Sequence, residues 1–392
     1  MKKRIYLDHA ATTPTDEKAL KVMSTYLTKV YANASGLHAE GVTAKKALSQ
    51  AREKVARLLE VRSEEIIFTS GGTESDNLAL SGVIQKARGS GIRNPHIITT
   101  SFEHSAILET CKALEGWGVQ VTYVNPEADG IVRPEKIIKE IKPDTVLVSV
   151  MYAQNEIGTI QPIRDIARAI KEIKTSSYKL KANSYPLFHT DACQAANYLD
   201  VAPNHLGVDL MTLAGSKIYG PKGSGILFAR HGIPISPIMF GGEQERGLRP
   251  GTEPVYLAAG FAEALSLTKA IREKEAARLE KMRDCFIHML LTLPGVRLNG
   301  HASKRLPNNV NVSIDGIDNE FFVIQLDNAG IACATRSACK TNEDKGSHVI
   351  LSLGKTDKEA KESIRFSLGR STTKKDIEQT LKVVRNLLIA KR

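Results

Sequence analysis

Short apolar runs alternate with segments of helical spacing through the first two thirds of this chain of 392 residues. The runs that predict strands lie at 66–68, 96–100, 119–124, 145–151, 186–191, 209–214 and 225–230. The segments that predict helices, with apolar residues three or four positions apart, lie at 16–30, 39–60, 74–86 and 104–114. Strands and helices in this alternation predict a mostly parallel sheet covered on both faces. Ligands bind such sheets at the carboxyl ends of the strands.

The pattern changes beyond Pro254. The elements expected there are a long helix at 255–291, a strand at 309–314, a helix near 319–329, a strand at 363–368 and a closing helix from Lys374. We therefore expect an α/β protein with two domains. The large α/β domain spans residues 15–255, and a smaller α+β domain combines residues 1–14, which include the first strand, with 256–392. The polar residues 175–185 lack periodicity, which predicts an exposed insertion.

The composition, with 42% hydrophobic and 25% charged residues, is that of an ordinary globular protein. No apolar run approaches the roughly 18 residues of a membrane span, and the first residues lack the apolar stretch of a secretion signal. We therefore expect a cytoplasmic protein. The five cysteines have no spacing typical of a metal site, so we expect reduced thiols and no bound metal.

The formal net charge of +11 permits contact with an acidic partner such as a tRNA, an acidic protein or a phosphorylated ligand. The lysines and arginines are scattered, however, and a lysine-rich enzyme surface explains them without any such partner. Direct nucleic-acid binding is therefore not required.

Polar residues follow several of the predicted strands. The segment SGGTES at 70–75 joins a strand to a helix, and Gly72 and Thr73 in it suit a phosphate, although a simple turn and helix cap has the same pattern. His104 could stack on an aromatic ligand or transfer protons, although a histidine at this position could also simply cap the following helix. Asp191 follows a buried strand and suits a protonated ring nitrogen, or a structural cap.

Lys217 follows an apolar strand and precedes a glycine-rich turn, where a surface lysine is the simplest interpretation. Combined with a phosphate loop and a strand-end aspartate, however, it completes the set of groups that holds pyridoxal phosphate. Two further residues remain open. Arg365, between apolar neighbours, suits a substrate carboxylate or a salt bridge to a helix. Cys339, in the polar segment 334–347, suits a reactive thiolate or an incidental surface thiol.

These residues lie in motifs that occur in the order YLDHAATTP, FTSGGTESDNLAL, EHSAILETC, NEIGTIQPI, HTDACQ, KIYGPKGSG, ERGLRPGT, RSAC and SIRFSLGR. In their order and spacing the chain resembles the NifS/IscS-like cysteine desulfurases over nearly its whole length. These enzymes form part of the class V aminotransferase family. The resemblance implies a fold-type I transferase that depends on pyridoxal 5'-phosphate, and it implies a role for each matching residue.

In this family, Lys217 would bond to the cofactor as a Schiff base, and His104 would stack on the ring and assist proton transfer. Asp191 would pair with the ring nitrogen, and Gln194 would contact the phenolic oxygen. Asn155 would lie near both the ring and the substrate. These assignments follow from the resemblance alone.

The resemblance also indicates which residues would contact the cofactor phosphate. Gly72 and Thr73 would bind it, and Thr252 would reach the phosphate of a neighbouring subunit, which implies a homodimer. Family members usually carry a serine and a histidine where this chain has Ala214 and Ser216. The Ser216 hydroxyl would then replace one of two altered phosphate contacts.

The implied reaction converts L-cysteine to L-alanine. Arg365 would hold the substrate carboxylate with Asn33 nearby, and Cys339, on a loop at about 333–354, would take the sulfur as a persulfide. The persulfide would pass to an acceptor protein, either an iron–sulfur scaffold or a tRNA-thiolation enzyme. Two alternatives stay open: a selenocysteine lyase, and a catalytically degenerate scaffold protein that keeps the fold to bind partners.

Overall fold

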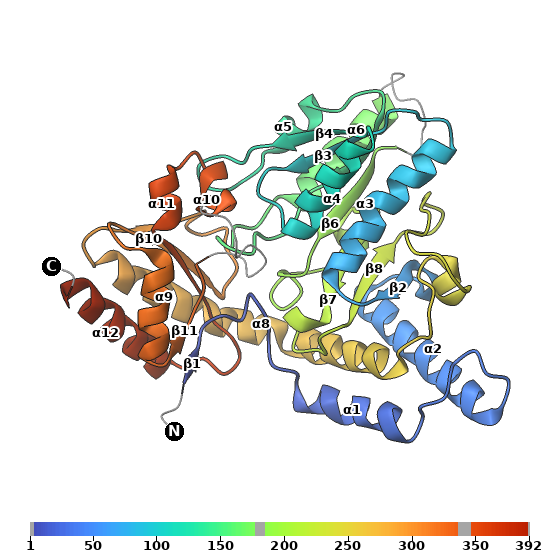
Figure 1. Cartoon of the computed structure of the whole chain (residues 1–392), viewed down its shortest axis with the longest axis horizontal. Coiled ribbons are helices and arrows are strands. Elements are labelled where there is room, and N and C mark those ends of the chain that lie inside the picture. Colours follow the sequence, from blue (N-terminus) through green and yellow to red (C-terminus); the bar gives the residue numbers. More distant parts are fainter. Residues whose placement is uncertain (1–3, 177–184, 336–345, 391–392) are drawn as a thin grey trace.

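The computed structural model describes residues 4–176, 185–335 and 346–390. Its largest layer is a seven-stranded sheet with the order β2-β8-β7-β6-β5-β3-β4 (Figure 1). The strands are β2 Ile66–Thr69, β3 His96–Thr100, β4 Gln120–Val124, β5 Thr145–Ser149, β6 Leu187–Asp191, β7 Leu210–Ala214 and β8 Gly225–Ala229. Strand β8 runs antiparallel to β2 and β7, and the other neighbours are parallel. The prediction of a mostly parallel sheet is confirmed.

Helices cover both faces of this sheet (Figure 1). The helices of this part of the chain are α1 Glu17–Thr28, α2 Ala39–Leu59, α3 Gly72–Gly89, α4 Ser105–Gly116, α5 Pro134–Lys139, α6 Ile163–Ser176 and α7 Pro203–Leu206, of which α1 packs against α8 Val255–Leu291 and not against the sheet. Successive strand residues point to opposite faces. Phe68 accordingly packs in one buried cluster with Val55 of α2, whereas its neighbour Ile67 packs in another with Leu80 of α3. Burial on both faces explains why these strands are continuous apolar runs.

A second, three-stranded antiparallel sheet has the order β12-β10-β9. The elements of this part are α8 Val255–Leu291, β9 Val296–Leu298, β10 Asn309–Ile314, α9 Asn319–Asn328, β11 Ile331–Ala332, α10 His348–Ser352, α11 Asp357–Lys361, β12 Ser363–Ser367 and α12 Lys374–Ala390. The N-terminal strand β1, Ile5–Tyr6, pairs with β11 in parallel. The expectation that the first strand joins the C-terminal part is confirmed.

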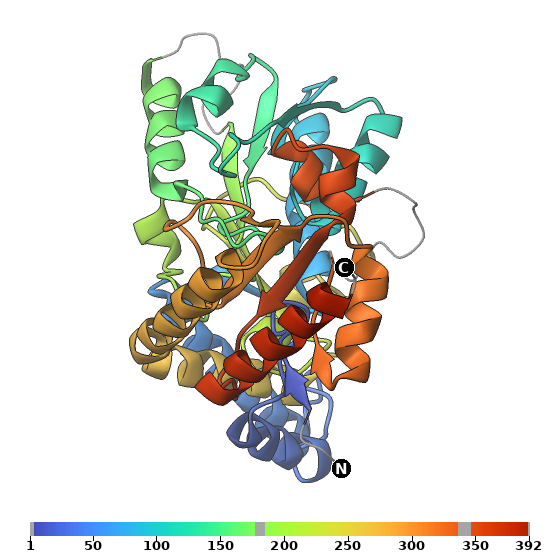
Figure 2. The same ribbon diagram turned by 90° about the vertical axis from the view of Figure 1, so that its left-hand side faces the viewer.

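Helix α8 joins the two parts, and its bounds agree with the sequence prediction. Val255 and Phe261 in its first half belong to a buried cluster that also contains residues of the large sheet. Leu279 and Phe286 in its second half belong to the cluster under the small sheet, where α12 lies beside the helix (Figure 2). Because one helix contributes to both cores, the domain boundaries at residues 15 and 255 stay a prediction.

The expected exposed insertion at 175–185 is wrong at both of its ends. Helix α6 continues to Ser176, and Tyr185 is buried, with only 4% of its surface exposed. Tyr185 packs with Leu187 of β6, so the chain enters the core before the strand begins. Residues 177–184 lie outside the described residues.

The composition of the polar segment 334–347 predicts an exposed loop, and this prediction is wrong at the end of the segment. Ser347 is buried, and its hydroxyl donates to Glu156 Oε2 at 2.5 Å. The short helix α10 follows directly and buries Val349 and Ile350. Five residues are too few for a helical period to show in the sequence.

Candidate active site

A cavity of about 220 Å³ lies at the carboxyl ends of the strands of the large sheet. The predicted site residues that line it are Gly72, Thr73, His104, Asn155, Asp191, Gln194, Ser216, Lys217 and Arg365. The first eight of them lie at or just after the carboxyl ends of β2, β3, β5, β6 and β7, and β12 of the small sheet carries Arg365. The cavity therefore lies between the two sheets.

The loop after β2 presents the start of α3 to this cavity. Gly71 has a φ of 154° and precedes the helix, so no side chain caps the first turn. A Cβ atom on Gly72 would lie only 3.0 Å from Cys193 Sγ, so the helix start packs tightly against the Cys193 side chain. Uncapped N–H groups at a helix N-terminus are well suited to a phosphate.

Lys217 projects from a single 3-10 turn, Gly215–Lys217, that follows β7. Its Nζ donates to the carbonyl oxygens of Ala10 and Ala11 at 2.9 and 2.6 Å. Gln194 Nε2 donates to the same Ala10 oxygen at 2.9 Å. The N-terminal segment thus places two predicted cofactor residues side by side.

His104 serves as the N-cap of α4, and its Nδ1 accepts a hydrogen bond of 3.1 Å from Ala106 N. In the neutral ring this acceptor role leaves the proton on Nε2. Asp191, at the end of β6, accepts a hydrogen bond of 2.9 Å from Cys193 N through Oδ1. Both residues therefore have the capping contacts expected from the sequence and line the cavity as well.

Two buried acids near the cavity were missed by the sequence analysis. Asp76 of α3 lines the cavity, and burial together with the charge of Asp191 raises its pKa well above the usual range. Burial raises the pKa of Glu103 to about 8. Burial also lowers the pKa of His189, whose Nε2 lies 3.7 Å from Asp76 Oδ1, to about 4. Asp76 follows Gly72 by four positions, so the two residues lie on the same face of the helix. This spacing could have indicated from the sequence that Asp76 lies near the site.

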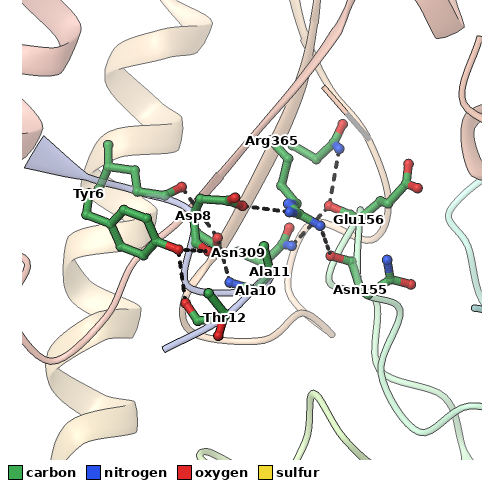
Figure 3. Close-up of polar contacts among 12 residues, drawn as sticks. Tyr6, Asp8, Ala10, Ala11, Thr12, Asn155, Glu156, Asn309 and Arg365 are labelled. Carbon is green, nitrogen blue, oxygen red and sulfur yellow. Dashed lines mark hydrogen bonds and ion pairs between the residues drawn. The ribbon is translucent and has the colours of Figure 1, made fainter. Parts of the chain in front are cut away.

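Arg365 is almost completely buried, with 1% of its surface exposed. Its Nη2 donates to Asp8 Oδ1 at 2.7 Å and its Nη1 to the Asn155 carbonyl oxygen at 3.0 Å (Figure 3). The salt bridge considered from the sequence therefore exists, but with the N-terminal segment and not with a helix. Arg365 nevertheless also lines the cavity.

Two predicted residues, Asn33 and Thr252, are not brought to the cavity. Asn33 is exposed between α1 and α2, and its Oδ1 accepts from Ser35 N at 2.9 Å. Thr252 is also exposed and does not line the cavity. Cys339 lies outside the described residues. The roles of these three residues stay predictions.

The described cysteines are poor candidates for the sulfur-accepting thiol. Burial raises the pKa of Cys333 to about 12 and raises the pKa values of Cys111 and Cys193 as well. Cys285 is exposed, but it lies on α8 in a groove beside α12, away from the cavity.

The residues around the cavity fit pyridoxal phosphate. Lys217 provides an amine for the carbonyl carbon of the cofactor, and Asp191 provides a carboxylate for its protonated ring nitrogen. The uncapped helix start at Gly72 provides N–H groups for its phosphate. No group of three or more His, Cys, Asp or Glu side chains that could hold a metal ion occurs among the described residues. Over the same ranges, no helix is long and apolar enough to cross a bilayer.

Comparison with known sequences agrees with this chemistry. A family model for class-V aminotransferases matches residues 5–380. Cysteine desulfurase IscS of Dictyoglomus turgidum is 40% identical over 389 residues, which cover 99% of this chain and 95% of the relative. Cysteine desulfurase IscS of Methanosarcina thermophila is 41% identical over 382 residues, which cover 97% of this chain and 91% of the relative.

Solved structures show the same relationship. A NifS-like protein matches with a TM-score of 0.89 at 35% identity, covering 98% of this chain and 99% of its own. A NifS-like protein from Rickettsia africae matches with a TM-score of 0.84 at 28% identity and the same coverage. Enzymes of this group depend on pyridoxal phosphate, the cofactor that the cavity fits. The chain belongs to the class-V aminotransferase family, within its branch of IscS- and NifS-like cysteine desulfurases.

Proposed function

We propose that this protein is a cysteine desulfurase that converts L-cysteine to L-alanine and retains the sulfur as an enzyme persulfide. The observation that carries the proposal is the convergence of Lys217, Asp191 and Arg365 on one cavity. Desulfurase relatives match the chain over almost its whole length, which supports the same reaction. A degenerate scaffold has no use for an intact set of catalytic groups.

The cavity residues divide the binding of cofactor and substrate between them. The N–H groups of Gly72 and Thr73 would hold the phosphate, and the Asp191 carboxylate would stabilise a positive charge on the ring nitrogen. Arg365 binds the substrate carboxylate through its guanidinium. When bound, pyridoxal phosphate supplies an electron sink for negative charge that develops on the substrate.

Lys217 Nζ is the group that moves the substrate proton. Its contacts with the carbonyl oxygens of Ala10 and Ala11 hold the amine inside the cavity when it is not bonded to the cofactor. His104 lines the same cavity and offers its Nε2 for proton transfer, because Nδ1 is engaged with the backbone of α4.

Cys339 accepts the sulfur. Its thiolate attacks the sulfur of the substrate, a sulfur–sulfur bond forms, and the carbon–sulfur bond breaks with its electron pair left on the substrate carbon. Protonation of that carbon completes alanine. The burial of Cys111, Cys193 and Cys333 supports this choice, because thiols held protonated are weak nucleophiles.

The persulfide passes to an acceptor protein in the cytoplasm, either an iron–sulfur scaffold or a tRNA-thiolation enzyme. The protein acts as a homodimer in which Thr252 of each subunit reaches the cofactor phosphate of the other. The exposure of Thr252 and of the large apolar side chains Tyr31, Leu37 and Phe240 supports an interface with a second copy.

A single assay tests the proposal. Purified protein loaded with pyridoxal phosphate is mixed with L-cysteine and a thiol reductant, and alanine and sulfide are measured together. Equal amounts of the two products are expected. A loaded protein that forms neither product from L-cysteine contradicts the proposal, and release of alanine from L-selenocysteine alone would establish a selenocysteine lyase.

A further inference from the structure

Asp8 holds the guanidinium of Arg365 from outside the cavity. Arg365 lines the cavity, but Asp8 does not. Asp8 Oδ1 takes a hydrogen bond of 2.7 Å from Nη2, while Nη1 binds the Asn155 carbonyl oxygen at 3.0 Å. Figure 3 shows the guanidinium held between these two partners. Two contacts on different nitrogens determine the orientation of the guanidinium plane.

Asp8 can orient Arg365 because its own backbone is held against β12. Asp8 forms a parallel bridge with Ser367, two residues beyond Arg365 on that strand. Ser367 N donates to the Leu7 oxygen at 2.7 Å, and Ala10 N donates to Ser367 Oγ at 2.9 Å. The ion pair is therefore built on backbone pairing between the two ends of the chain.

Arg365 retains donors after these contacts are made. Its Nε is buried and has no hydrogen-bond partner among the described residues, and each Nη carries a second N–H group. Most buried polar groups in proteins form hydrogen bonds. If the ion pair between Asp8 and Arg365 served stability alone, the buried Nε of Arg365 would be expected to have a hydrogen-bond partner. Free donors on a guanidinium at a cavity wall fit a second carboxylate.

We propose that Asp8 is a positioning residue, which holds Arg365 so that its remaining N–H groups meet the carboxylate of the amino acid in the cavity. The inference rests on the proposed function, in which Arg365 binds that carboxylate. A long side chain that is already immobilised loses less conformational freedom when the ligand binds. Removing Asp8 is therefore expected to weaken binding of the amino acid about tenfold.

The test uses the full-length protein loaded with pyridoxal phosphate. L-alanine, or ethylamine, which has no carboxylate, is titrated while the absorbance of the bound cofactor is recorded. Asp8→Ala is expected to raise the dissociation constant of L-alanine about tenfold and to leave that of ethylamine unchanged. Asp8→Asn keeps an oxygen acceptor and is expected to stay within about threefold of wild type for both.

Asp16→Ala is the matched control. It also removes an N-terminal aspartate that pairs with an arginine, at 3.1 Å from Arg370 Nη1, but Arg370 does not line the cavity. The Asp16→Ala variant is expected to bind L-alanine with the affinity of wild type. Asp8→Ser, which shortens the side chain but keeps it polar, is the second variant if Asp8→Ala does not fold, and the same difference between the two amines is expected.

Two results would overturn the role of Asp8: wild-type affinity for L-alanine in the variant, or an equal loss of affinity for L-alanine and ethylamine. Urea unfolding of the apoprotein, followed by circular dichroism, checks that each variant is folded. A wild-type protein that binds L-alanine but yields no alanine from L-cysteine would overturn the proposed function, and the titrations would still decide the role of Asp8.

Discussion

The hydroxyl of Ser347 donates a hydrogen bond of 2.5 Å to Glu156 Oε2, and both residues are buried. The carbonyl oxygen of Glu156 accepts from Asn309 and Asn311 of β10, at 3.0 and 3.1 Å. Its neighbour Asn155 lines the cavity. One short turn after β5 therefore connects the cavity to the small sheet and to the segment that follows residues 336–345.

Removal of the Ser347 hydroxyl is expected to destabilise the protein. Ser347→Ala takes a hydrogen-bond donor from a buried carboxylate, which costs about 1–3 kcal/mol in the free energy of unfolding. Urea denaturation measures this loss. Ser352→Ala, which removes a partly buried hydroxyl that donates to Val349 O in the same helix, is the control and is expected to cost less. Equal losses in the two variants would contradict the importance of the Glu156 contact.

Replacement of Lys217 is expected to abolish turnover. Lys217→Ala removes the amine that bonds to the cofactor and moves the substrate proton, so the visible absorbance typical of the lysine-bound cofactor and the release of alanine should both disappear. Lys222→Ala, an exposed lysine in the same glycine-rich turn, should keep both. Alanine release at the wild-type rate by Lys217→Ala would rule out the assignment.

The cysteine variants should behave differently from one another. Cys339→Ser is expected to keep the cofactor absorbance but to form no persulfide, as measured by mass spectrometry of the intact protein. Cys333→Ser should still form it, because burial raises the pKa of Cys333 to about 12 and leaves little thiolate. If only Cys333→Ser loses the persulfide, Cys339 is the wrong residue.

A methyl group at Gly72 is expected to weaken cofactor binding. Its Cβ would lie 3.0 Å from Cys193 Sγ, so the Cys193 side chain and the start of α3 must move apart by a few tenths of an ångström. The N–H groups at the start of α3 would then meet the phosphate less well. Gly72→Ala should raise the dissociation constant of pyridoxal phosphate about tenfold, measured by fluorescence titration of the apoprotein. Gly89→Ala, at the other end of α3 with open space around it, should bind as wild type does.

The contribution of Glu103 to the stability of the apoprotein should fall as the pH rises from about 5 to 8. Burial raises the pKa of Glu103 to about 8, so over this range the folded state keeps a proton that the unfolded state has released. The contribution of Glu103 to the free energy of unfolding therefore declines by up to about 1.4 kcal/mol per pH unit and levels off above pH 8. Urea unfolding at several pH values should therefore show the stability of wild type falling relative to that of Glu103→Gln as the pH rises, whereas Glu53→Gln, on the exposed face of α2, should match wild type at every pH.

Much of the fold was predictable because its signals are local. The strands of the large sheet are continuous apolar runs, and helices α2, α3 and α8 have clear apolar periodicity, so each element can be recognised within its own residues. The short helices α10 and α11 were not predicted, because five residues contain little more than one turn.

The sequence by itself determined that polar groups such as Lys217 and Asp191 follow buried strands, and parallel strands bring their carboxyl ends to one edge. Only the tertiary structure decided which charges meet. Asp8 and Arg365 are 357 residues apart, and Asp76 lies within an ordinary helix. Their interactions depend on distances of a few ångströms and on burial, which arise when segments far apart in the chain pack together and have no local signature in the sequence.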